Sequence, residues 1–121
     1  MSKSILVVED TEDNRQILRD LLGAAGYTLI EAHDGAEGVA KAIEHRPDLI
    51  LMDIQMPVMD GYEAARRIKA DPALRAIPIV AVTSYALSGD EQKARAAGCD
   101  SYIAKPYSPR QMLAKVRELI G

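Results

Sequence analysis

The sequence of 121 residues contains no phenylalanine and no tryptophan, and its aromatic residues are five tyrosines. A hydrophobic core must therefore be built mainly from leucine, isoleucine, valine, alanine and methionine. Apolar residues make up 48% of the chain and charged residues 27%, which is typical of a globular protein rather than of a disordered or fibrous one. The length fits one compact domain, which we expect to span residues 1–121.

Cysteine is nearly absent. Cys99 is the single cysteine of the sequence, so no internal disulfide can form, as is usual in a reducing cytoplasm. It ends a run of small residues at 96–99. We therefore expect a small buried side chain rather than a reactive thiol.

Long apolar runs and basic patches are absent as well. No stretch approaches the roughly 20 residues that a transmembrane helix needs. The first residues lead directly into a short apolar segment, without the apolar run and cleavage site of a signal peptide. The formal net charge is -3, and no basic patch points to nucleic acid. We expect a cytoplasmic protein that binds neither membranes nor nucleic acid.

Five short apolar runs alternate with segments of helical periodicity. The runs at 5–8, 49–52 and 79–82 are continuously apolar and too short for helices, so they predict strands buried on both faces. Two weaker strands are expected at 28–32 and 102–104. The apolar positions expected on the inner faces of the helices are Ile17, Leu18, Leu21, Leu22, Val39, Ala42, Ile43, Ala65, Ile68, Met112, Leu113 and Val116.

This alternation predicts an α/β fold, a doubly wound parallel sheet with helices on both faces and right-handed crossovers. Asp34 is expected to cap the helix that follows it. In the helix that ends near residue 70, we expect Arg66, Arg67 and Lys69 to face water. The last helix reaches the end of the chain, so no output domain is expected.

Polar side chains directly follow four of the apolar runs. Glu9 and Asp10 follow the first run, and Asp53 follows the third. Thr83 and Lys105 follow the fourth and the fifth. Ligands of open parallel sheets bind beyond the carboxyl ends of the strands, so these five side chains should converge at one edge. Three carboxylates packed together repel one another unless a cation lies among them.

Mg²⁺ suits such a site, because it prefers hard oxygen ligands, keeps some of its waters and binds phosphate oxygens. A carboxylate nucleophile beside it can form an acyl phosphate. In phosphoryl transfer the protein mainly aligns and neutralises three phosphoryl oxygens, and Mg²⁺, Lys105 and Thr83 could take one each. The pattern therefore indicates phosphoryl transfer to Asp53.

Each member of this set also has a simpler explanation. An aspartate after a strand is often a turn residue, and Glu9 and Asp10 could cap the next helix, as could Thr11 or Asp13. Their shared position at the same end of the strands favours the functional interpretation.

The segments that carry these residues resemble the receiver domain of two-component response regulators, particularly single-domain regulators of the chemotaxis and cell-division type. Residues 51–61 read Leu-Met-Asp-Ile-Gln-Met-Pro-Val-Met-Asp-Gly and are close to the family's phosphoacceptor segment. The segments 7–10, 79–84, 97–102 and 105–106 resemble other parts of the family pattern, so the resemblance covers the whole chain.

The resemblance implies a flavodoxin-like (βα)5 fold with five parallel strands in the order 2-1-3-4-5. It implies that Asp53 is the phosphoacceptor. It also implies that Mg²⁺, with Mn²⁺ as an alternative, is held by Glu9, Asp10, Asp53 and the backbone carbonyl of Gln55.

The resemblance further implies a switch. Thr83 would move to the phosphoryl group, Tyr102 would turn inward, and Lys105 would pair with the phosphate. The peptide bond before Pro106 would be cis. The donor would be a phosphohistidine on a histidine kinase or a histidine phosphotransfer protein, and a downstream kinase or effector would be a further partner.

Two positions are expected to affect hydrolysis of the acyl phosphate. Gln55 lies two residues after Asp53, and Tyr85 lies two residues after Thr83, near the approach of an attacking water. We expect both to slow hydrolysis. For Tyr85, packing on the following helix as part of a docking surface is an equal alternative.

The leading hypothesis is a signalling switch, not a conventional enzyme, since it would catalyse only its own phosphorylation and dephosphorylation. A phosphatase of the haloacid dehalogenase type uses a second aspartate two residues after the nucleophile, where this chain has Gln55. A module that binds without phosphorylation, and a receiver within a larger regulator, are further alternatives.

Overall fold

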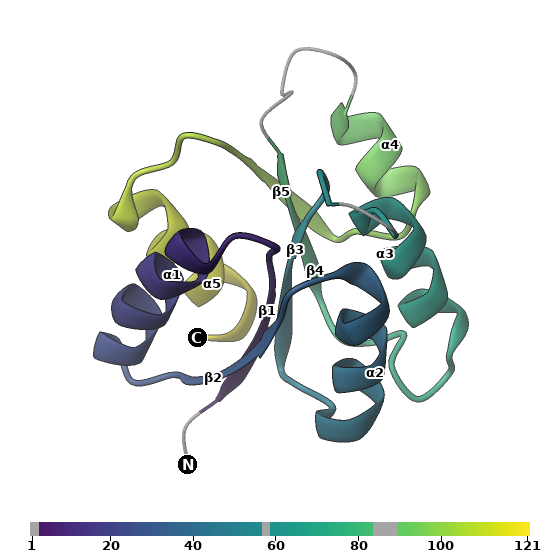
Figure 1. Cartoon of the computed structure of the whole chain (residues 1–121), viewed down its shortest axis with the longest axis horizontal. Coiled ribbons are helices and arrows are strands. Elements are labelled where there is room, and N and C mark those ends of the chain that lie inside the picture. The colour runs from purple at the N-terminus through teal and green to yellow at the C-terminus, as the bar shows by residue number, and fades with distance from the viewer. Residues whose placement is uncertain (1–2, 57–58, 84–89) are drawn as a thin grey trace.

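The computed structural model describes residues 3–56, 59–83 and 90–121. Within these residues, five strands and five helices alternate along the chain (Figure 1). The strands are β1 (Ser4–Val8), β2 (Thr28–Ala32), β3 (Leu49–Asp53), β4 (Ile79–Thr83) and β5 (Ser101–Ala104). The helices are α1 (Glu12–Ala24), α2 (Gly35–His45), α3 (Gly61–Ala70), α4 (Asp90–Ala96) and α5 (Pro109–Ile120).

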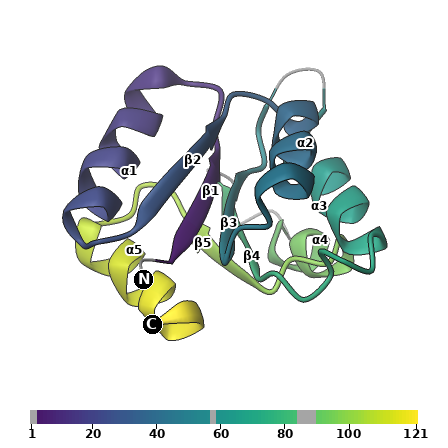
Figure 2. The same ribbon diagram turned by 90° about the horizontal axis from the view of Figure 1, so that it is seen from below.

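The strands form one parallel sheet in the order β2-β1-β3-β4-β5. Helices α1 and α5 cover one face, and α2, α3 and α4 cover the other (Figure 2). The predicted doubly wound α/β fold and its strand order are therefore confirmed. The chain leaves β1 for α1 on one face and leaves β3 for α3 on the other face, so the carboxyl ends of β1 and β3 flank the topological switch point.

The core has two parts, one on each face of the sheet. Leu6 and Val8 of β1 belong to the cluster beneath α2, α3 and α4, whereas Ile5 and Val7 belong to the cluster beneath α1 and α5. This alternation follows from the two-residue period of a strand. It explains why the central strands are continuously apolar. Cys99 is buried in the first cluster, as expected.

Two isoleucines that were expected to face the core are exposed. Ile17 is 57% exposed and Ile43 is 54% exposed. The buried stripe of α1 is centred on Leu18 and Leu22, which leaves Ile17 at its edge. In α2, Ala42 is fully buried, and its neighbour Ile43 lies beyond the contact with the sheet. Helical periodicity identified the correct face but not its width.

Lys69 was expected to face water, and this prediction was wrong. Its side chain is 17% exposed, and its Nζ pairs with Asp100 Oδ2 at 2.8 Å. The same Nζ donates to the carbonyl oxygens of Arg75 at 2.9 Å and Ile77 at 2.8 Å. Its stem crosses Gly98, whose φ is 99°. These partners come from other segments, so the period of α3 could not reveal them.

Local signals at the helix starts behave as the sequence predicts. Asp34 Oδ1 accepts the amide of Glu37 at 2.7 Å, which confirms the predicted N-cap of α2. The Lys105–Pro106 peptide bond is cis, also as predicted.

Among the helices of the described residues, none combines the length and the apolar character that a membrane span requires.

Candidate functional site

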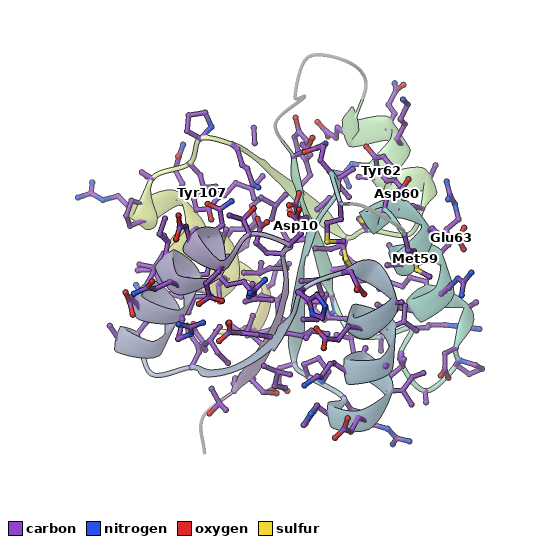
Figure 3. The ribbon with its side chains drawn as sticks, in the orientation of Figure 1. Asp10, Met59, Asp60, Tyr62, Glu63 and Tyr107 are labelled. Carbon is purple, nitrogen blue, oxygen red and sulfur yellow. The ribbon has the colours of Figure 1, made fainter. Side chains whose placement is uncertain are left out.

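Three carboxylates meet at the carboxyl ends of β1 and β3. Val8 pairs with Met52 in the sheet register, so Glu9, the next residue, lies beside Asp53. One oxygen each from Glu9, Asp10 and Asp53 lies within 4.8 Å of the others. Glu9 and Asp53 are buried, whereas Asp10 is exposed. Figure 3 shows Asp10 at this end of the sheet, between Tyr107 on the α1 side and Asp60 on the α3 side.

The ammonium group of Lys105 lies against this cluster. Its Nζ is 3.1 Å from Glu9 Oε1 and 3.5 Å from Asp53 Oδ2. Thr83 pairs with Ala104 in the register, so Lys105 follows at the same edge as the other side chains. The predicted convergence of the carboxylates and Lys105 is confirmed, and it results from parallel strands that end in register.

Glu9 does not cap α1. Its Oε2 accepts the amide of Thr11 at 3.0 Å, and its Oε1 accepts the side-chain amide of Asn14 at 3.3 Å as well as Lys105 Nζ. Thr11 is the N-cap residue of α1, and its side chain makes no capping hydrogen bond. The capping explanation of Glu9 is therefore not supported, and its carboxylate instead belongs to the pocket.

The charges in this pocket are not balanced by protein groups. Burial raises the pKa of Asp53 to about 7, and the negative charge of Glu9 adds to this effect. Partial desolvation at the mouth of the pocket and the neighbouring Glu9 also raise the pKa of Asp10. Burial opposes ionisation of Glu9, but the Thr11 amide and Lys105 hold its pKa below the usual range. Lys105 supplies one positive charge against three acids, so the donor set favours an added cation with hard oxygen ligands.

Gln55 and Thr83 are connected in a way that the sequence did not indicate. Thr83 is fully buried, and its Oγ1 accepts the side-chain amide of Gln55 at 3.1 Å. The backbone amide of Gln55 donates to Asp53 Oδ1 at 3.1 Å. Sequence analysis placed Gln55 near the site through its position after Asp53, but a contact across β3 and β4 carries no sequence signal.

Gly61 is a further residue that sequence analysis missed. A Cβ atom at this position would lie 2.4 Å from the backbone oxygen of Asp53 and 2.8 Å from Ile54 Cδ1. The backbone of α3 can therefore approach the end of β3 this closely only with glycine. Asp60, the preceding residue, caps α3 by accepting the Glu63 amide at 3.0 Å. This pair of residues sets the position of α3 relative to Asp53.

A polar pocket surrounds the acidic cluster, and an apolar groove adjoins it. The residues that line the pocket are Glu9, Asp10, Thr11, Asn14, Asp53, Gln55 and Lys105. The groove is lined by Asn14, Ile17, Lys105, Pro106 and Tyr107. Asn14 and Lys105 belong to both. The exposed Ile17 is thus next to the site. Tyr107 also lines the groove, and burial of its side chain raises the pKa of its hydroxyl.

The remaining predicted residues are less informative. Tyr102 is half-buried and packs against the core cluster beneath α2, α3 and α4. Tyr85 lies outside the described residues, as do Pro57 and Val58 of the resembling segment and Ser84 after β4. The functional roles assigned to the site residues from the sequence stay predictions.

Comparison with known proteins gives one consistent result. The response regulator receiver domain family matches residues 5–117. A polar-differentiation response regulator DivK from Brucella anthropi is 46% identical over 121 residues, which is 100% of this chain and 98% of DivK. The homologous DivK of Brucella ovis is 45% identical over the same coverage.

Solved structures agree with these relatives. The chemotaxis protein CheY4 of Vibrio cholerae is 30% identical with a TM-score of 0.94, over 99% of this chain and 100% of that one. The receiver domain of a sensor histidine kinase from Pseudomonas aeruginosa PAO1 is 37% identical with a TM-score of 0.93, over 100% of this chain and 99% of that one. That structure has a magnesium ion coordinated in its active-site cleft. The family match, the fold and the relatives together show that this chain belongs to the response regulator receiver domain family.

Proposed function

We propose that this chain is a phosphorylation switch in which Asp53 accepts a phosphoryl group in a Mg²⁺-dependent reaction. Receiver domains are signalling proteins of two-component systems rather than conventional enzymes, and they interact with histidine kinases or phosphotransfer proteins. The observation that supports the proposal best is the buried Asp53, which lies 3.5 Å from the Lys105 ammonium and beside two further carboxylates. We assign the whole of 1–121 to this receiver, acting in the cytoplasm.

The metal would be held by the carboxylates of Glu9, Asp10 and Asp53 and by the backbone carbonyl of Gln55. The acidic excess of the pocket and the exposure of Asp10 to solvent fit a cation that keeps some of its waters. When bound, Mg²⁺ supplies positive charge that screens the carboxylates and one oxygen of the incoming phosphoryl group.

Asp53 acts as the nucleophile. In the reaction its ionised carboxylate forms the new O–P bond while the N–P bond of a phosphohistidine breaks and the imidazole nitrogen keeps the bonding electron pair and later takes up a proton. The raised pKa of Asp53 means that the metal-free site holds a proton on this group below about pH 7. Metal binding would favour the ionised, reactive form.

Phosphorylation would then rearrange the hydrogen bonds of three side chains. Lys105, now close to Glu9 and Asp53, would pair with a phosphoryl oxygen. Thr83, whose Oγ1 now accepts the side-chain amide of Gln55, would donate its hydroxyl hydrogen to another phosphoryl oxygen. The phosphoryl group adds close to two negative charges, so these donors bind the phosphorylated Asp53 better than they bind its free carboxylate. Tyr102 would transmit the change to the surface.

The phosphodonor would dock over the apolar groove. Ile17 and Tyr107 expose apolar surface directly beside the mouth of the acidic pocket, and the groove continues to Leu21 and Pro109. A histidine kinase or phosphotransfer protein that packs a helix here would bring a phosphohistidine to Asp53. A downstream kinase or effector would recognise the phosphorylated form.

The test is intact mass after incubation with Mg²⁺ and acetyl phosphate. Wild type should gain one phosphoryl group, whereas Asp53→Asn and a sample with EDTA should not. If wild type gains no mass, phosphohistidine donors should be tried on the same three samples. A failure with both kinds of donor would contradict the switch and favour a module that acts by binding alone.

A further inference from the structure

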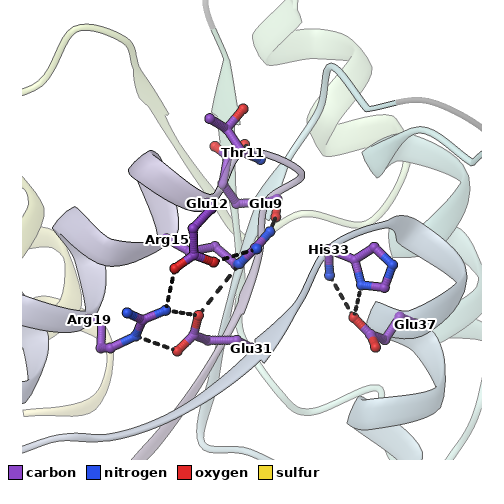
Figure 4. Close-up of polar contacts among 8 residues, drawn as sticks. All are labelled: Glu9, Thr11, Glu12, Arg15, Arg19, Glu31, His33 and Glu37. Atoms are coloured by element: carbon purple, nitrogen blue, oxygen red, sulfur yellow. Dashed lines mark hydrogen bonds and ion pairs between the residues drawn. The ribbon is translucent and has the colours of Figure 1, made fainter.

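Arg15, in the first turn of α1, lies beside the acidic pocket without lining it. Its side chain is 15% exposed. Its Nη1 donates to the backbone carbonyl oxygen of Glu9 at 2.6 Å. Nη2 pairs with Glu12 Oε2 at 2.6 Å, and Nε lies 3.5 Å from Glu31 Oε1 (Figure 4). Each nitrogen of the guanidinium group therefore faces an acceptor on a different segment.

The carbonyl that Arg15 holds belongs to the peptide unit joining Glu9 to Asp10. A peptide unit is planar, so fixing its oxygen restricts ψ of Glu9 and φ of Asp10 together. On the other side of Glu9, its amide donates to the carbonyl of Ala32 at 3.0 Å. The hydrogen bond from Arg15 thus restrains the backbone that directs two neighbouring carboxylates to the pocket.

Arg15 shares its two acidic partners with a second arginine. Arg19 pairs with both oxygens of Glu31, at 2.7 Å each, and with Glu12 Oε1 at 3.1 Å. The two acidic residues therefore bridge Arg15 and Arg19 and join α1 to β2 (Figure 4). Arg19 shares these partners but makes no contact with Glu9 among the hydrogen bonds and ion pairs of the described residues.

We propose that Arg15 is a positioning residue for the divalent metal, holding the Glu9–Asp10 peptide so that both carboxylates face the cation. The proposal rests on the Mg²⁺ site of the proposed function. Residues that orient metal ligands typically change metal affinity about 10–100-fold when they are replaced. We expect Arg15→Gln to weaken Mg²⁺ binding about tenfold.

Positioning and simple electrostatics predict opposite results. Arg15 carries a positive charge near the site, so removing that charge should strengthen cation binding if charge alone mattered. Loss of the hydrogen bond to Glu9 should weaken it. Arg19→Gln is the matched control, because it removes an equal charge that pairs with the same two acidic residues but leaves the hydrogen bond from Arg15 to the Glu9 carbonyl in place.

The experiment is a calorimetric Mg²⁺ titration of wild type, R15Q and R19Q at about pH 8, where Asp53 is mostly ionised. Amide chemical shifts of Asp10 and Asp53 during the titration give a second readout, and a thermal melt in EDTA reports folding. We expect the affinity of R19Q to stay within about twofold of wild type, because exposed ion pairs contribute little.

The outcomes separate this inference from the proposed function. If wild type binds no Mg²⁺, the proposed site itself fails. If wild type binds and R15Q binds as tightly as R19Q or more tightly, the positioning role is overturned. Should R15Q not fold, Arg15→Met is compared with Arg19→Met. Methionine keeps an unbranched stem but has no group that can donate to the Glu9 carbonyl, so weaker binding by R15M supports the role and equal binding overturns it.

Discussion

The side-chain amide of Gln55 holds the hydroxyl of Thr83 at 3.1 Å, across the carboxyl ends of β3 and β4. The backbone amide of the same Gln55 donates to Asp53 Oδ1. One residue therefore contacts both the predicted phosphoacceptor and the hydroxyl that is predicted to move towards the phosphate. Movement of Thr83 requires this hydrogen bond to be exchanged.

Gln55→Ala should speed hydrolysis of the acyl phosphate. The shorter side chain opens the pocket around Asp53 to attacking water, and loss of a contact of about 1 kcal/mol corresponds to about fivefold in rate. Loss of the phosphorylated mass over time, after removal of acetyl phosphate, measures this rate. Gln16→Ala, an exposed glutamine of α1, should hydrolyse at the wild-type rate. If Gln55→Ala hydrolyses at the same rate as wild type and Gln16→Ala, Gln55 does not shield the acyl phosphate from water.

The metal-free protein should become less stable as the pH rises from about 5.5 to 8. The pKa of Asp53 is raised from 3.8 to about 7 in the folded state. The folded protein therefore binds a proton that the unfolded chain has already released. This contribution is fully present below about pH 4 and is lost as the pH rises through 7, and about 2 kcal/mol of it is lost between pH 5.5 and 8. Thermal melts in EDTA across this range measure it.

Asp53→Asn is the control for this pH dependence. It should lose most of the decline between about pH 5.5 and 8, because the raised carboxyl is gone. Mg²⁺ should restore the stability of wild type at the upper end of the range, since it binds the folded protein. An identical decline in wild type and Asp53→Asn would show that another group causes it.

Gly61→Ala should impair both stability and phosphorylation. The added Cβ would meet the backbone oxygen of Asp53 at 2.4 Å, so either α3 or the end of β3 must shift. We expect a loss of about 1–3 kcal/mol in the free energy of unfolding, as for other overpacked sites, and a slower mass gain with acetyl phosphate.

Gly23→Ala provides the matched control on α1. No atom lies within 4 Å of the Cβ that it would add, and alanine is favoured over glycine in a helix by about 0.5–1 kcal/mol. This variant should therefore be slightly more stable than wild type and should phosphorylate normally. Equal effects of the two substitutions on urea denaturation would contradict the close approach at Asp53.

Lys69→Met should destabilise the fold and leave the site chemically competent. Its ammonium group binds the carbonyls of Arg75 and Ile77 and the carboxylate of Asp100, at the end of the sheet opposite Asp53. Loss of these charge-assisted hydrogen bonds should lower the free energy of unfolding by about 2–3 kcal/mol. Arg67→Met, which removes an exposed pair with Glu63, should cost less than about 0.5 kcal/mol.

Urea denaturation and intact mass distinguish the two effects of the Lys69 variant. Below its unfolding transition, Lys69→Met should still gain one phosphoryl group with acetyl phosphate and Mg²⁺. Stability equal to that of Arg67→Met would mean that the buried contacts of Lys69 are not important for the fold.

Much of the fold could be predicted because its signals are local. The continuous apolar runs of β1, β3 and β4 need burial on both faces, and parallel strands with helices on both sides satisfy that need. Asp34 and Pro109 mark helix starts through hydrogen bonds and backbone angles within a few residues of themselves.

The candidate site was also predictable in outline. Glu9, Asp53 and Lys105 each follow an apolar run, and the carboxyl ends of parallel strands lie at one edge. Once the runs are recognised as neighbouring strands, their convergence follows. The sequence determined by itself the fold class, the strand ends and the polar residues that meet there.

Tertiary structure alone decided which side chains contact one another across those ends. The bond from Gln55 to Thr83, that from Arg15 to the Glu9 carbonyl, and the position of Lys69 all join separate segments, or depend on a rotamer that packing selects. Periodicity shows which face a residue lies on. It cannot show how far that face is covered or which acceptor a long side chain reaches, because both depend on the distances between elements after packing.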